Sequence, residues 1–313
     1  MLVIQNTENF RIESPCILTI GTFDGVHLGH QKILSRLKEL KQKTGLETVV
    51  LTFEPHPRKV LFPKDDLKLI TSVDEKLELL DQYGVDVSVV YPFTKEFSQL
   101  DSGYYIDEIL LRRLNVKFLV IGYDHRFGKD RRGDINTLKE AALDKGFSIE
   151  EISAQDIDHI IISSSKIRKA LEEGNVEMAS GFLGHHFFLN GQVTRGKQLG
   201  RTLGYPTANL KLNETEKIIP AIGVYFVEVI VETTAYYGMM SVGLNPTTDN
   251  DHNVKLEVHI FDFNSDIYFR FIKVNFLKRL RDEKKFNGLV ELKAALDMDK
   301  EECLQLINTL AVK

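Results

Sequence analysis

The sequence predicts two domains: an α/β domain with a parallel sheet, followed by an antiparallel sheet or small β-barrel with a C-terminal helix. Two observations predict this order. Short β-branched apolar runs alternate with helical patterns in the first part of the 313-residue chain. From about residue 182, strand-like segments follow one another without intervening helices. The boundary is therefore expected near residues 180–187, and we place the domains at residues 1–183 and 184–313.

Four apolar runs are the expected strands of the first domain. Each is short and reads as a strand buried on both faces, and they span residues 16–20, 48–53, 87–91 and 117–122. The helical patterns between them carry apolar stripes at Ile33, Leu34, Leu37 and Leu40, and at Leu77 and Leu80. A β–α–β alternation implies parallel strands joined by right-handed crossovers. Ligands in such folds bind at the C-terminal ends of the strands.

The second domain is expected to be built from alternating strands. They begin at the segment HHFFLNGQV and include residues 224–232, 255–261 and 267–276. The apolar phase shifts between Phe271 and Ile272, which predicts a bulge or a sharp twist there. From residue 289 to residue 310 the pattern returns to a helical period.

Composition bounds the class of protein. Apolar residues make up 43% and charged residues 27% of the chain, as in ordinary globular proteins. A net charge of -5 argues against an obligate nucleic-acid binder. Cys16 and Cys303 are too far apart for a disulfide framework or a zinc site. The N-terminus is too polar for a signal peptide and no apolar run approaches membrane length, so we expect a cytoplasmic protein without a membrane partner.

The first expected strand leads directly into the motif GTFDGVHLGH, residues 21–30. His27 and His30 are three residues apart, so they share a face at the first turn of a helix. Their imidazole N–H groups, the free backbone N–H groups of that turn and the helix dipole together favour a bound phosphate. The three glycines let the backbone approach a ligand. A tight turn with incidental surface histidines would explain one histidine, whereas two at this spacing favour a phosphate site.

A second motif, SSSKIRKAL, begins at residue 163. Its three serines can supply hydroxyl groups and helix-start amides, and Arg168 can bind phosphate through two parallel hydrogen bonds. An ordinary serine N-cap followed by a solvated arginine would give the same pattern. The residues alone leave both interpretations open.

These motifs resemble a known family. GTFDGVHLGH resembles the HxGH signature of nucleotidylyltransferases, and with TFEPHPR (52–58), IGYDHRFG (121–128) and SSSKIR (163–168) it is similar to the N-terminal module of bacterial bifunctional riboflavin kinase/FAD synthetases. GRTLGYPTANL (200–210), GVYFVEV (223–229) and LEVHIFDF (256–263) resemble the kinase module of the same family. The resemblance spans essentially the whole chain. It implies a Rossmann-like nucleotidylyltransferase domain followed by a small antiparallel riboflavin kinase β-barrel.

The resemblance implies two ATP-dependent reactions on flavins. Riboflavin would be phosphorylated to FMN, and FMN would be adenylylated to FAD with release of pyrophosphate. ATP, riboflavin, FMN and FAD are the implied ligands, and Mg²⁺ is the implied cofactor. No nucleic-acid or membrane partner is expected, and the chain is expected to be a monomer or a weak homo-oligomer.

For adenylyl transfer, the resemblance makes His27 and His30 the catalytic donors to the phosphates. The implied nucleotide contacts are Gly21, Phe23, Asp24, Gly29, Ser163, Ser164, Ser165 and Arg168, and the implied flavin side consists of Pro55, His56, Pro57, Asp124 and Arg126. Two residues depart from the family pattern. His125 stands where phenylalanine is common, and Ser165 stands where threonine is common.

For the kinase, the resemblance makes Thr207 and Asn209 the ligands of Mg²⁺ and the nucleotide. It makes Glu257 the general base that accepts the proton of the riboflavin hydroxyl. A solvent-facing strand residue would equally explain Glu257 on the pattern alone. Strand alternation, however, places Glu257 on a face with His259 and Phe261, and an aromatic neighbour speaks against a plainly solvated face.

Two further kinase residues follow from the resemblance. Gly200 belongs to a glycine-rich segment expected to cover the phosphates, and Arg281 to a segment expected to close over the flavin. Phe269, where glycine is common, and Thr248, where an aromatic residue is common, depart from the family pattern and affect the shape of the flavin pocket.

Three other functions fit parts of the sequence. They are an enzyme with only one active module, a non-enzymatic flavin carrier or sensor, and a cytidylyltransferase for a small phosphorylated alcohol. The kinase motifs speak against the cytidylyltransferase, which has no use for a kinase barrel. The presence of both sets of polar residues speaks against the carrier.

Overall fold

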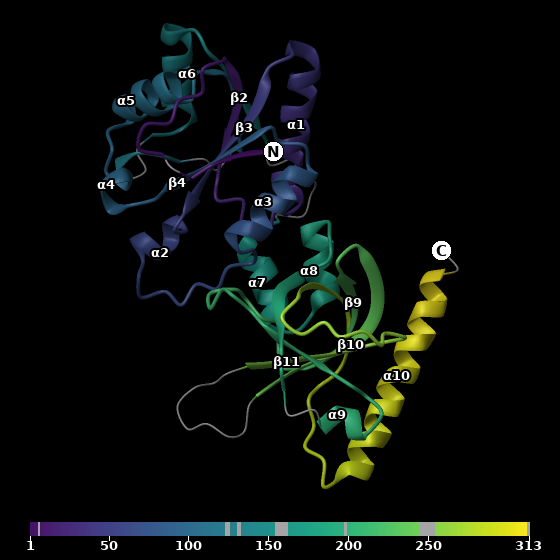
Figure 1. Ribbon diagram of the computed structural model, residues 1–313. Helices are drawn as coiled ribbons and strands as arrows, with labels where there is room; N and C mark the ends of the chain where they lie inside the picture. The colour runs from purple at the N-terminus through teal and green to yellow at the C-terminus, as the bar shows by residue number, and fades with distance from the viewer. Residues whose placement is uncertain are drawn as a thin grey trace. The chain divides into compact units, whose positions relative to one another are not determined.

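The computed structural model describes residues 1–5, 7–122, 126–129, 133–153, 162–196, 199–244 and 254–311. The chain forms two compact units, Met1–Ser164 and Ser165–Lys313 (Figure 1). Each unit has its own sheet and its own apolar core, and each is described separately below.

The first unit is built on a six-stranded sheet in which all neighbouring strands are parallel. In spatial order the strands are β1 (Leu2–Ile4), β4 (Val87–Pro92), β3 (Glu47–Glu54), β2 (Cys16–Ile20), β5 (Val116–Gly122) and β6 (Ser148–Ile152). The four expected strands are confirmed as β2, β3, β4 and β5. The edge strands β1 and β6 were missed because β1 is only three residues long and mostly exposed, and β6 is partly exposed with two glutamates between its isoleucines.

Helices cover both faces of this sheet. Figure 1 shows α1 and α3 on one side of the strands, and α5 and α6 on the other. The helices are α1 (Leu28–Thr44), α2 (Pro57–Leu61), α3 (Val73–Gln82), α4 (Lys95–Ser98), α5 (Ser102–Tyr104), the π-helix η1 (Tyr105–Arg113) and α6 (Ile135–Lys145). The predicted stripe of α1 is buried, as are Leu77 and Leu80 of α3. Strand order reverses between β2 and β5, so the ligand crevice of this fold is expected where β2 ends.

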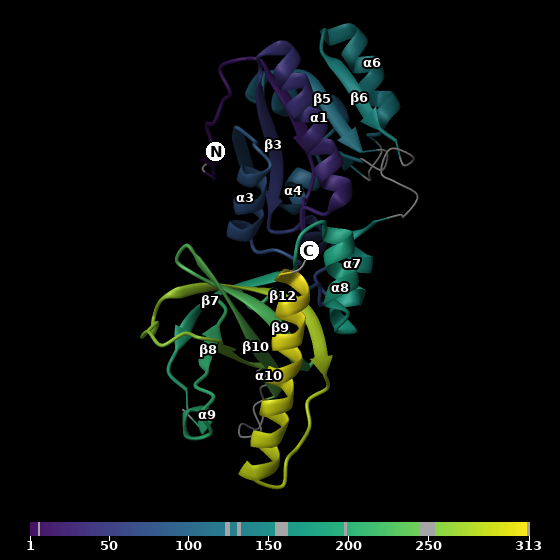
Figure 2. The ribbon, with the colours of Figure 1, turned by 90° about the vertical axis from the view of Figure 1, so that its right-hand side faces the viewer.

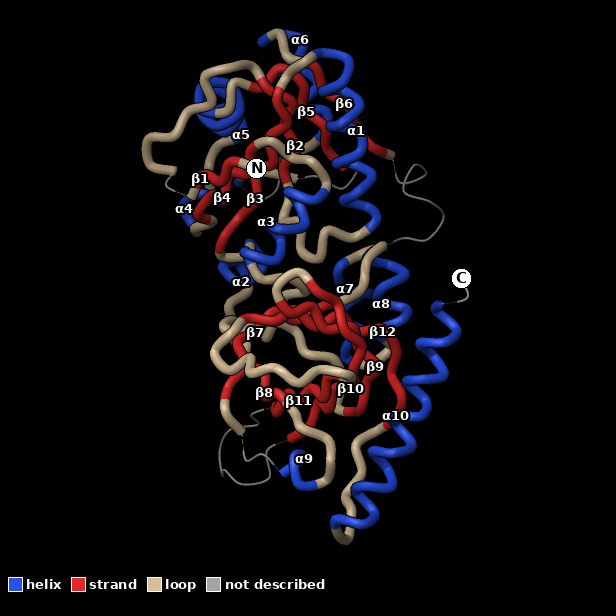
Figure 3. Tube along the Cα trace, turned by 45° about the vertical axis from the view of Figure 1, so that its right-hand side comes forward, coloured by secondary structure: helices blue, strands red, loops and turns tan. Residues whose placement is uncertain are grey.

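The second unit is a closed antiparallel barrel, which confirms the small barrel expected from the sequence (Figure 3). Its strands, in order around the barrel, are β10 (Thr234–Leu244), β11 (Val254–Ile260), β8 (Ala208–Lys211), β7 (Phe188–Thr194), β12 (Phe271–Arg281) and β9 (Gly223–Val231). The predicted bulge between Phe271 and Ile272 is wrong. The apolar phase changes there because β12 begins at Phe271, and the register shifts lie further along, after Phe276 and after Arg279.

The helices of the C-terminal half are α7 (Ser164–Glu172), α8 (Val176–Leu183), α9 (Leu199–Thr202) and α10 (Leu289–Ala311). The predicted tail helix is confirmed as α10, which lies along the outside of the barrel (Figure 2). Tyr205, Phe226, Phe261 and Cys303 form the apolar cluster beneath it, together with partly buried leucines such as Leu296. Burial of this cluster fixes α10 to the barrel.

The compact units divide between Ser164 and Ser165, ahead of the boundary expected between residues 183 and 184. The difference is the helix pair α7–α8. Helix α8 packs against β12, and the backbone N–H of Ala221 donates to the carbonyl oxygen of Leu171 in α7 (3.0 Å). The assignment of functional domains at residues 183 and 184 stays a prediction.

Candidate functional site

The first predicted site begins at the turn that leaves β2. The backbone N–H of Gly21 donates to the carbonyl oxygen of Leu51 in β3 (3.1 Å), which holds the turn at the sheet edge. The backbone then adopts positive φ at Phe23 (50°), Gly25 (83°) and Val26 (39°). Such φ values cost a non-glycine residue about 1–3 kcal/mol and concentrate at functional sites. The strain therefore lies on Phe23 and Val26, whereas Gly25 adopts its positive φ without a steric cost.

The carboxylate of Asp24 joins this turn to the segment before α3. Asp24 is only 3% exposed. Its Oδ1 accepts hydrogen bonds from the backbone N–H of Ile70 (2.9 Å), the backbone N–H of Thr71 (3.0 Å) and the Thr71 hydroxyl (3.3 Å). The backbone N–H of Gly25 donates in turn to Thr71 Oγ1 (3.0 Å). Asp24 thus holds the turn in place, a role that sequence reasoning did not assign to it.

His27 and His30 lie together at the start of α1, as predicted. His27 is the N-cap residue, and its Nδ1 accepts from the backbone N–H of His30 (3.4 Å). The two imidazole rings stack with centroids 3.7 Å apart and an interplanar angle of 14°. Because Nδ1 of His27 accepts, its neutral ring carries the proton on Nε2. One backbone N–H that the sequence analysis left free for phosphate is therefore already engaged.

His30 is a neutral imidazole with one nitrogen unused. Burial, and then the nearby His27 and Lys76, lower the pKa of His30 well below its ordinary value of 6.5. Its Nδ1 is buried and has no hydrogen-bond partner within the described part of the chain. The ring also lies against Phe23, with centroids 4.8 Å apart. These contacts fix the orientation of the ring.

A buried cation, Lys76, stands at the same edge of the sheet. Its side chain donates to Thr52 Oγ1 (3.0 Å) and to the carbonyl oxygen of Phe53 (3.4 Å), both at the end of β3. Burial lowers the pKa of Lys76, although the carboxylates of Glu54 and Asp24 act in the opposite direction. Sequence reasoning missed this residue. The available signal was a charge four residues before the buried Leu80, on the apolar face of α3.

The predicted flavin side begins where β3 ends. His56 is the N-cap of α2, and its Nδ1 accepts from the backbone N–H of Arg58 (3.1 Å). His56 borders a small cavity of about 10 Å³ together with Asp24 and Lys76, so this wall adjoins the histidine turn. Pro55 is exposed and Pro57 half-buried on either side of it.

The loop after β5 is described only in part. Asp124 and His125 lie outside the described residues. Arg126 forms an exposed ion pair with Asp134 (3.2 Å), the N-cap residue of α6. This pair ties the loop to α6 and leaves the predicted contact of Arg126 with flavin untested.

The serine motif reaches the first site through Ser164. Its hydroxyl donates to the carbonyl oxygen of Asp24 (3.2 Å), so Ser164, the last residue of the first unit, lies beside the turn. Ser163 is half-buried and Ser165 is exposed. Arg168 is buried in the part of α7 that belongs to the second unit. Gly29 is buried in the first turn of α1.

The second predicted site centres on the pairing of β8 with β11. Glu257 and Asn209 are direct partners in this antiparallel pair, and Val258 is the partner of Ala208. Directly opposed residues place their side chains on the same face of a sheet. The structure therefore brings the predicted base and one predicted metal ligand together. Glu257 Oε2 also pairs with Lys255 Nζ at 2.7 Å.

Two glycines let the preceding loop lie against this pair. A Cβ atom at Gly196 would fall 2.2 Å from Asn209 Nδ2. A Cβ atom at Gly200 would fall 2.2 Å from the carbonyl oxygen of Tyr205 and 3.5 Å from Thr207 Cγ2. The backbone N–H of Tyr205 donates back to the Gly200 carbonyl (2.8 Å). Glycine is required at both positions because the backbone approaches so closely.

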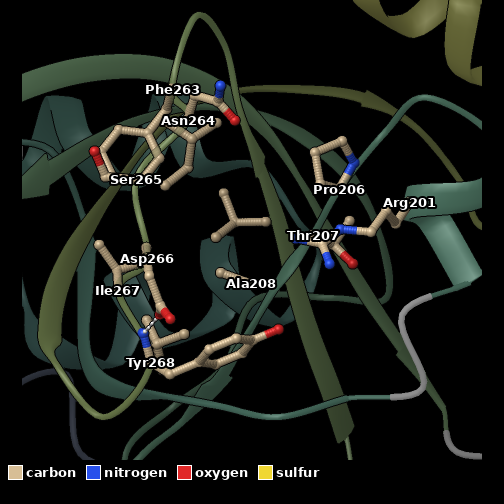
Figure 4. Close-up of a pocket in the computed structure, with 13 residues that line it drawn as sticks. Arg201, Pro206, Thr207, Ala208, Phe263, Asn264, Ser265, Asp266, Ile267 and Tyr268 are labelled. Carbon is tan, nitrogen blue, oxygen red and sulfur yellow. Dashed lines mark hydrogen bonds between the residues drawn. The ribbon is translucent and has the colours of Figure 1, made fainter.

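A cavity of about 340 Å³ opens beside Thr207 (Figure 4). Pro206, Thr207 and Ala208 line one side, and residues 263–268, which follow β11, line the other. Within the latter segment the backbone N–H of Tyr268 donates to Asp266 Oδ1 (2.9 Å). Cavities of this size hold small-molecule ligands. Figure 4 shows Thr207 and Arg201 together at one border of the cavity.

Arg281 is engaged within the second unit. Its Nε and Nη2 atoms bind the two carboxylate oxygens of Asp299 in α10 at 2.8 and 2.7 Å. The Asp299 side chain is only 5% exposed. The guanidinium also lies 5.8 Å from the centroid of Phe286. Arg281 therefore anchors α10 to the end of β12, and its predicted flavin contact is untested.

Two residues expected near the flavin pocket, Thr248 and Phe269, depart from the family pattern. Thr248 lies outside the described residues. Phe269 has a φ of 66°, which explains why glycine suits this position. Its ring is 61% exposed and lies beside Arg195, 6.0 Å from the guanidinium carbon.

Comparison with known proteins gives matches over both units. A model of the FAD synthetase family matches residues 9–166, and a model of the riboflavin kinase family matches residues 183–307. A Bacillus subtilis protein named bifunctional riboflavin kinase/FMN adenylyltransferase is 37% identical, over 95% of this chain and 94% of its own length. An Escherichia coli K12 protein of the same name is 38% identical, over 91% of this chain and 90% of its own.

A solved structure shares the fold of the whole chain. It is named as a macrolide-efflux protein from Streptococcus pneumoniae, and it aligns with a TM-score of 0.87 at 33% identity, covering 96% of this chain and 98% of its own. Among the helices that the structure describes, none is both long enough and apolar enough to cross a bilayer.

Proposed function

This chain belongs to the bifunctional riboflavin kinase/FMN adenylyltransferase family, and from that premise we propose which of its residues perform each reaction. It phosphorylates riboflavin to FMN and adenylylates FMN to FAD. We assign adenylyl transfer to the turn after β2 in the first unit. We assign phosphorylation to the β8–β11 pair and the adjoining cavity in the second.

In adenylyl transfer, an FMN phosphate oxygen attacks the α-phosphorus of ATP, and the bond to the β-phosphate breaks to release pyrophosphate. This reaction requires alignment of two anions and stabilisation of the charge that builds on the phosphates. His27 and His30 are the proposed donors, because their rings stack against each other at the start of α1, directly after the strained turn. Loss of one such donor raises a barrier by about 2.7–4 kcal/mol.

The remaining contacts of this site are proposed from the family motif. The nucleotide would be held by Gly21, Phe23, Asp24, Gly29, Ser163, Ser164, Ser165 and Arg168, and the flavin by Pro55, His56, Pro57, Asp124 and Arg126. The hydrogen bond from Ser164 to the turn supports the first group. The small cavity shared by His56 and Asp24 supports the second group. For Asp24, the hydrogen bonds it accepts support a role in shaping the turn.

In the kinase reaction, the riboflavin hydroxyl oxygen attacks the γ-phosphorus of ATP, and ADP leaves. We assign Glu257 as the base that accepts the hydroxyl proton. Thr207 and Asn209 would hold Mg²⁺, which would neutralise charge on the phosphates when bound. The residues fit such an ion, since hydroxyl and amide oxygens are hard ligands and the absent side chains of Gly196 and Gly200 leave room beside both.

We place the nucleotide in the cavity beside Thr207, with Gly200 covering its phosphates, because Thr207 borders this cavity. The flavin side would include Arg281, which would then bind flavin while held by Asp299. We further propose a cytoplasmic monomer or weak homo-oligomer, consistent with the ordinary composition of the chain and with ATP, riboflavin, FMN and FAD as its ligands.

The observation that carries this assignment is the direct pairing of Glu257 with Asn209. It is tested by incubating purified variants with riboflavin and MgATP, or with FMN and MgATP, and separating the flavins by chromatography. Glu257→Gln is expected to make no FMN but to convert added FMN to FAD. His30→Ala is expected to make FMN but no FAD.

Glu228→Gln is the matched control for the kinase variant. Glu228 is also a strand glutamate of the barrel, but its carboxylate binds Asn275 (2.8 Å). This control is expected to retain both reactions. If Glu257→Gln still phosphorylated riboflavin at the parent rate, or if His30→Ala still made FAD at the parent rate, the corresponding site assignment would be refuted.

A further inference from the structure

His259 is a buried histidine that neither proposed reaction uses. It lies on β11 two residues after Glu257, so both side chains leave the same face of the strand. It is only 8% exposed. A buried imidazole needs a partner for its polar atoms, and the identity of that partner indicates its role.

The partner is the backbone of the segment that carries Thr207. His259 Nδ1 lies 2.8 Å from the carbonyl oxygen of Pro206. A carbonyl oxygen only accepts, so Nδ1 of His259 carries the proton and donates it. This carbonyl belongs to the peptide group that joins Pro206 to Thr207. The hydrogen bond therefore fixes the peptide plane from which Thr207 begins.

The rest of this segment is held on either side of that bond. Before it, the backbone N–H of Tyr205 donates to the Gly200 carbonyl (2.8 Å). After it, Ala208 and Asn209 are paired with β11. The Pro206–Thr207 peptide lies between these two fixed points, just ahead of Ala208, the first residue of β8. The imidazole of His259 adds a side-chain constraint to this peptide.

The imidazole is itself held by its neighbours. Tyr205 and Phe261 contact it edge-on, with ring centroids at 5.1 and 5.6 Å. The Tyr205 hydroxyl donates to Asp297 Oδ1 in α10 (2.5 Å). Tyr205 and His259 thus connect α10 to the segment that carries Thr207.

We propose that His259 is a positioning residue of the kinase site, which sets the place of Thr207 by holding the Pro206 carbonyl. This proposal rests on the assignment of Thr207 to the nucleotide and metal made above. His259 acts on the binding of MgATP, since it touches the backbone of the nucleotide segment. It has no part in adenylyl transfer.

The test compares His259→Leu and His259→Asn in riboflavin kinase assays. In one series MgATP is varied at saturating riboflavin, and in the other riboflavin is varied at saturating MgATP. Asparagine places its amide nitrogen where Nδ1 stood, whereas leucine fills the space without a donor. His259→Leu is expected to raise the KM for MgATP roughly 2- to 12-fold, the range for one neutral hydrogen bond. The KM for riboflavin is expected to stay within about twofold, as for a group that does not touch the flavin. His259→Asn is expected to restore the KM for MgATP.

Phe261→Leu is the matched packing control, because the Phe261 ring packs against His259 with centroids 5.6 Å apart but has no group that could donate to the Pro206 carbonyl. FMN adenylylation by each preparation and its thermal unfolding report on folding. If His259→Leu does not fold, His259→Gln takes its place, since its amide lies one bond further out and is expected to raise the KM.

The inference is overturned if His259→Asn, folded, raises the KM for MgATP as much as leucine or glutamine does. It is equally overturned if Phe261→Leu raises it to the same extent, because packing alone would then be responsible. Thr207→Ala separates this inference from its premise. Unchanged kinase activity in Thr207→Ala would remove the premise. An impaired Thr207→Ala beside a normal KM in His259→Leu would refute the role of His259 alone.

Discussion

Replacing Asp24 by alanine is expected to destabilise the first unit because its carboxylate closes the turn that carries the histidines. Oδ1 of Asp24 accepts hydrogen bonds from the buried backbone N–H groups of Ile70 and Thr71 and from the Thr71 hydroxyl. Ile70 and Thr71 are themselves almost completely buried. Without the carboxylate, these donors have no acceptor at that place.

The magnitude follows from the two backbone N–H groups. Each buried donor left unsatisfied costs about 1–3 kcal/mol, so Asp24→Ala, which leaves two, is expected to lower the free energy of unfolding by about 2–6 kcal/mol. At a slope of about 2 kcal/mol per molar urea, the midpoint falls by roughly 1–3 M. Asp24→Asn keeps an oxygen acceptor and loses only the charge, so it is expected to cost less.

Hydrogen exchange in increasing urea, read by mass spectrometry, measures this effect unit by unit. The peptides that cover β2 and α3 report on the first unit, and those that cover the barrel strands report on the second. Circular dichroism serves as the bulk probe, since the chain has no tryptophan. Asp66→Ala is the control, because the Asp66 carboxylate is exposed and pairs only with Lys68 among the ion pairs of the described residues.

The reasoning is refuted if Asp24→Ala unfolds at the same urea concentration as Asp66→Ala but no longer binds ATP in the first unit. Asp24 would then act only as the proposed nucleotide contact, and its role in shaping the turn would be wrong. Early exchange confined to the first unit, with riboflavin kinase activity retained, is the expected result.

Three further predictions concern other contacts. Gly196→Ala is expected to lower riboflavin kinase activity at least about tenfold while FMN adenylylation persists, because the added Cβ would displace the Asn209 amide. Gly181→Ala is the control, since a Cβ added at Gly181 would have no heavy atom within 4 Å. Equal kinase rates in the two variants would contradict the predicted displacement of Asn209. Arg281→Met is expected to destabilise the second unit by about 3–5 kcal/mol in urea, and more than Asp299→Leu, because it leaves a buried carboxylate unpaired; the reverse order would contradict this. The pKa of His30 is lowered in the folded protein, so below pH 6.5 the unfolded chain binds more protons than the folded one. The first unit is therefore expected to lose stability as pH falls below 6.5, by up to about 1.4 kcal/mol per pH unit. Urea midpoints of the parent and of His30→Phe at pH 7.5 and 5.5 measure this loss, and an equal pH dependence in both proteins would contradict it.

Local patterns in the sequence were sufficient for the central strands β2 to β5, for the helices α1, α3 and α10, and for the first motif. β2 has the predicted bounds, because five consecutive apolar or β-branched residues are typical of a strand buried on both faces. The stacking of His27 and His30 follows from their spacing at a helix start, which is a local property. The edge strands β1 and β6 were missed because a partly exposed strand leaves a weaker pattern.

The predicted bulge in β12 was wrong for a related reason. A change of apolar phase is produced equally by a bulge and by the start of a strand, and only the ladder distinguishes them. The position of Phe269 belongs here as well. Its departure from glycine was visible in the sequence, but its positive φ is a consequence of the turn that the barrel imposes.

The sequence by itself determined the order of strands and helices, the residues available for phosphate chemistry and the family of the chain. The tertiary structure alone decided that Asp24 binds the segment at Thr71, that Lys76 is buried at the end of β3, and that Glu257 faces Asn209. The physical reason is distance along the chain. Helical and strand periodicities act over a few residues, whereas strand register and the burial of a polar group depend on segments that only folding brings together.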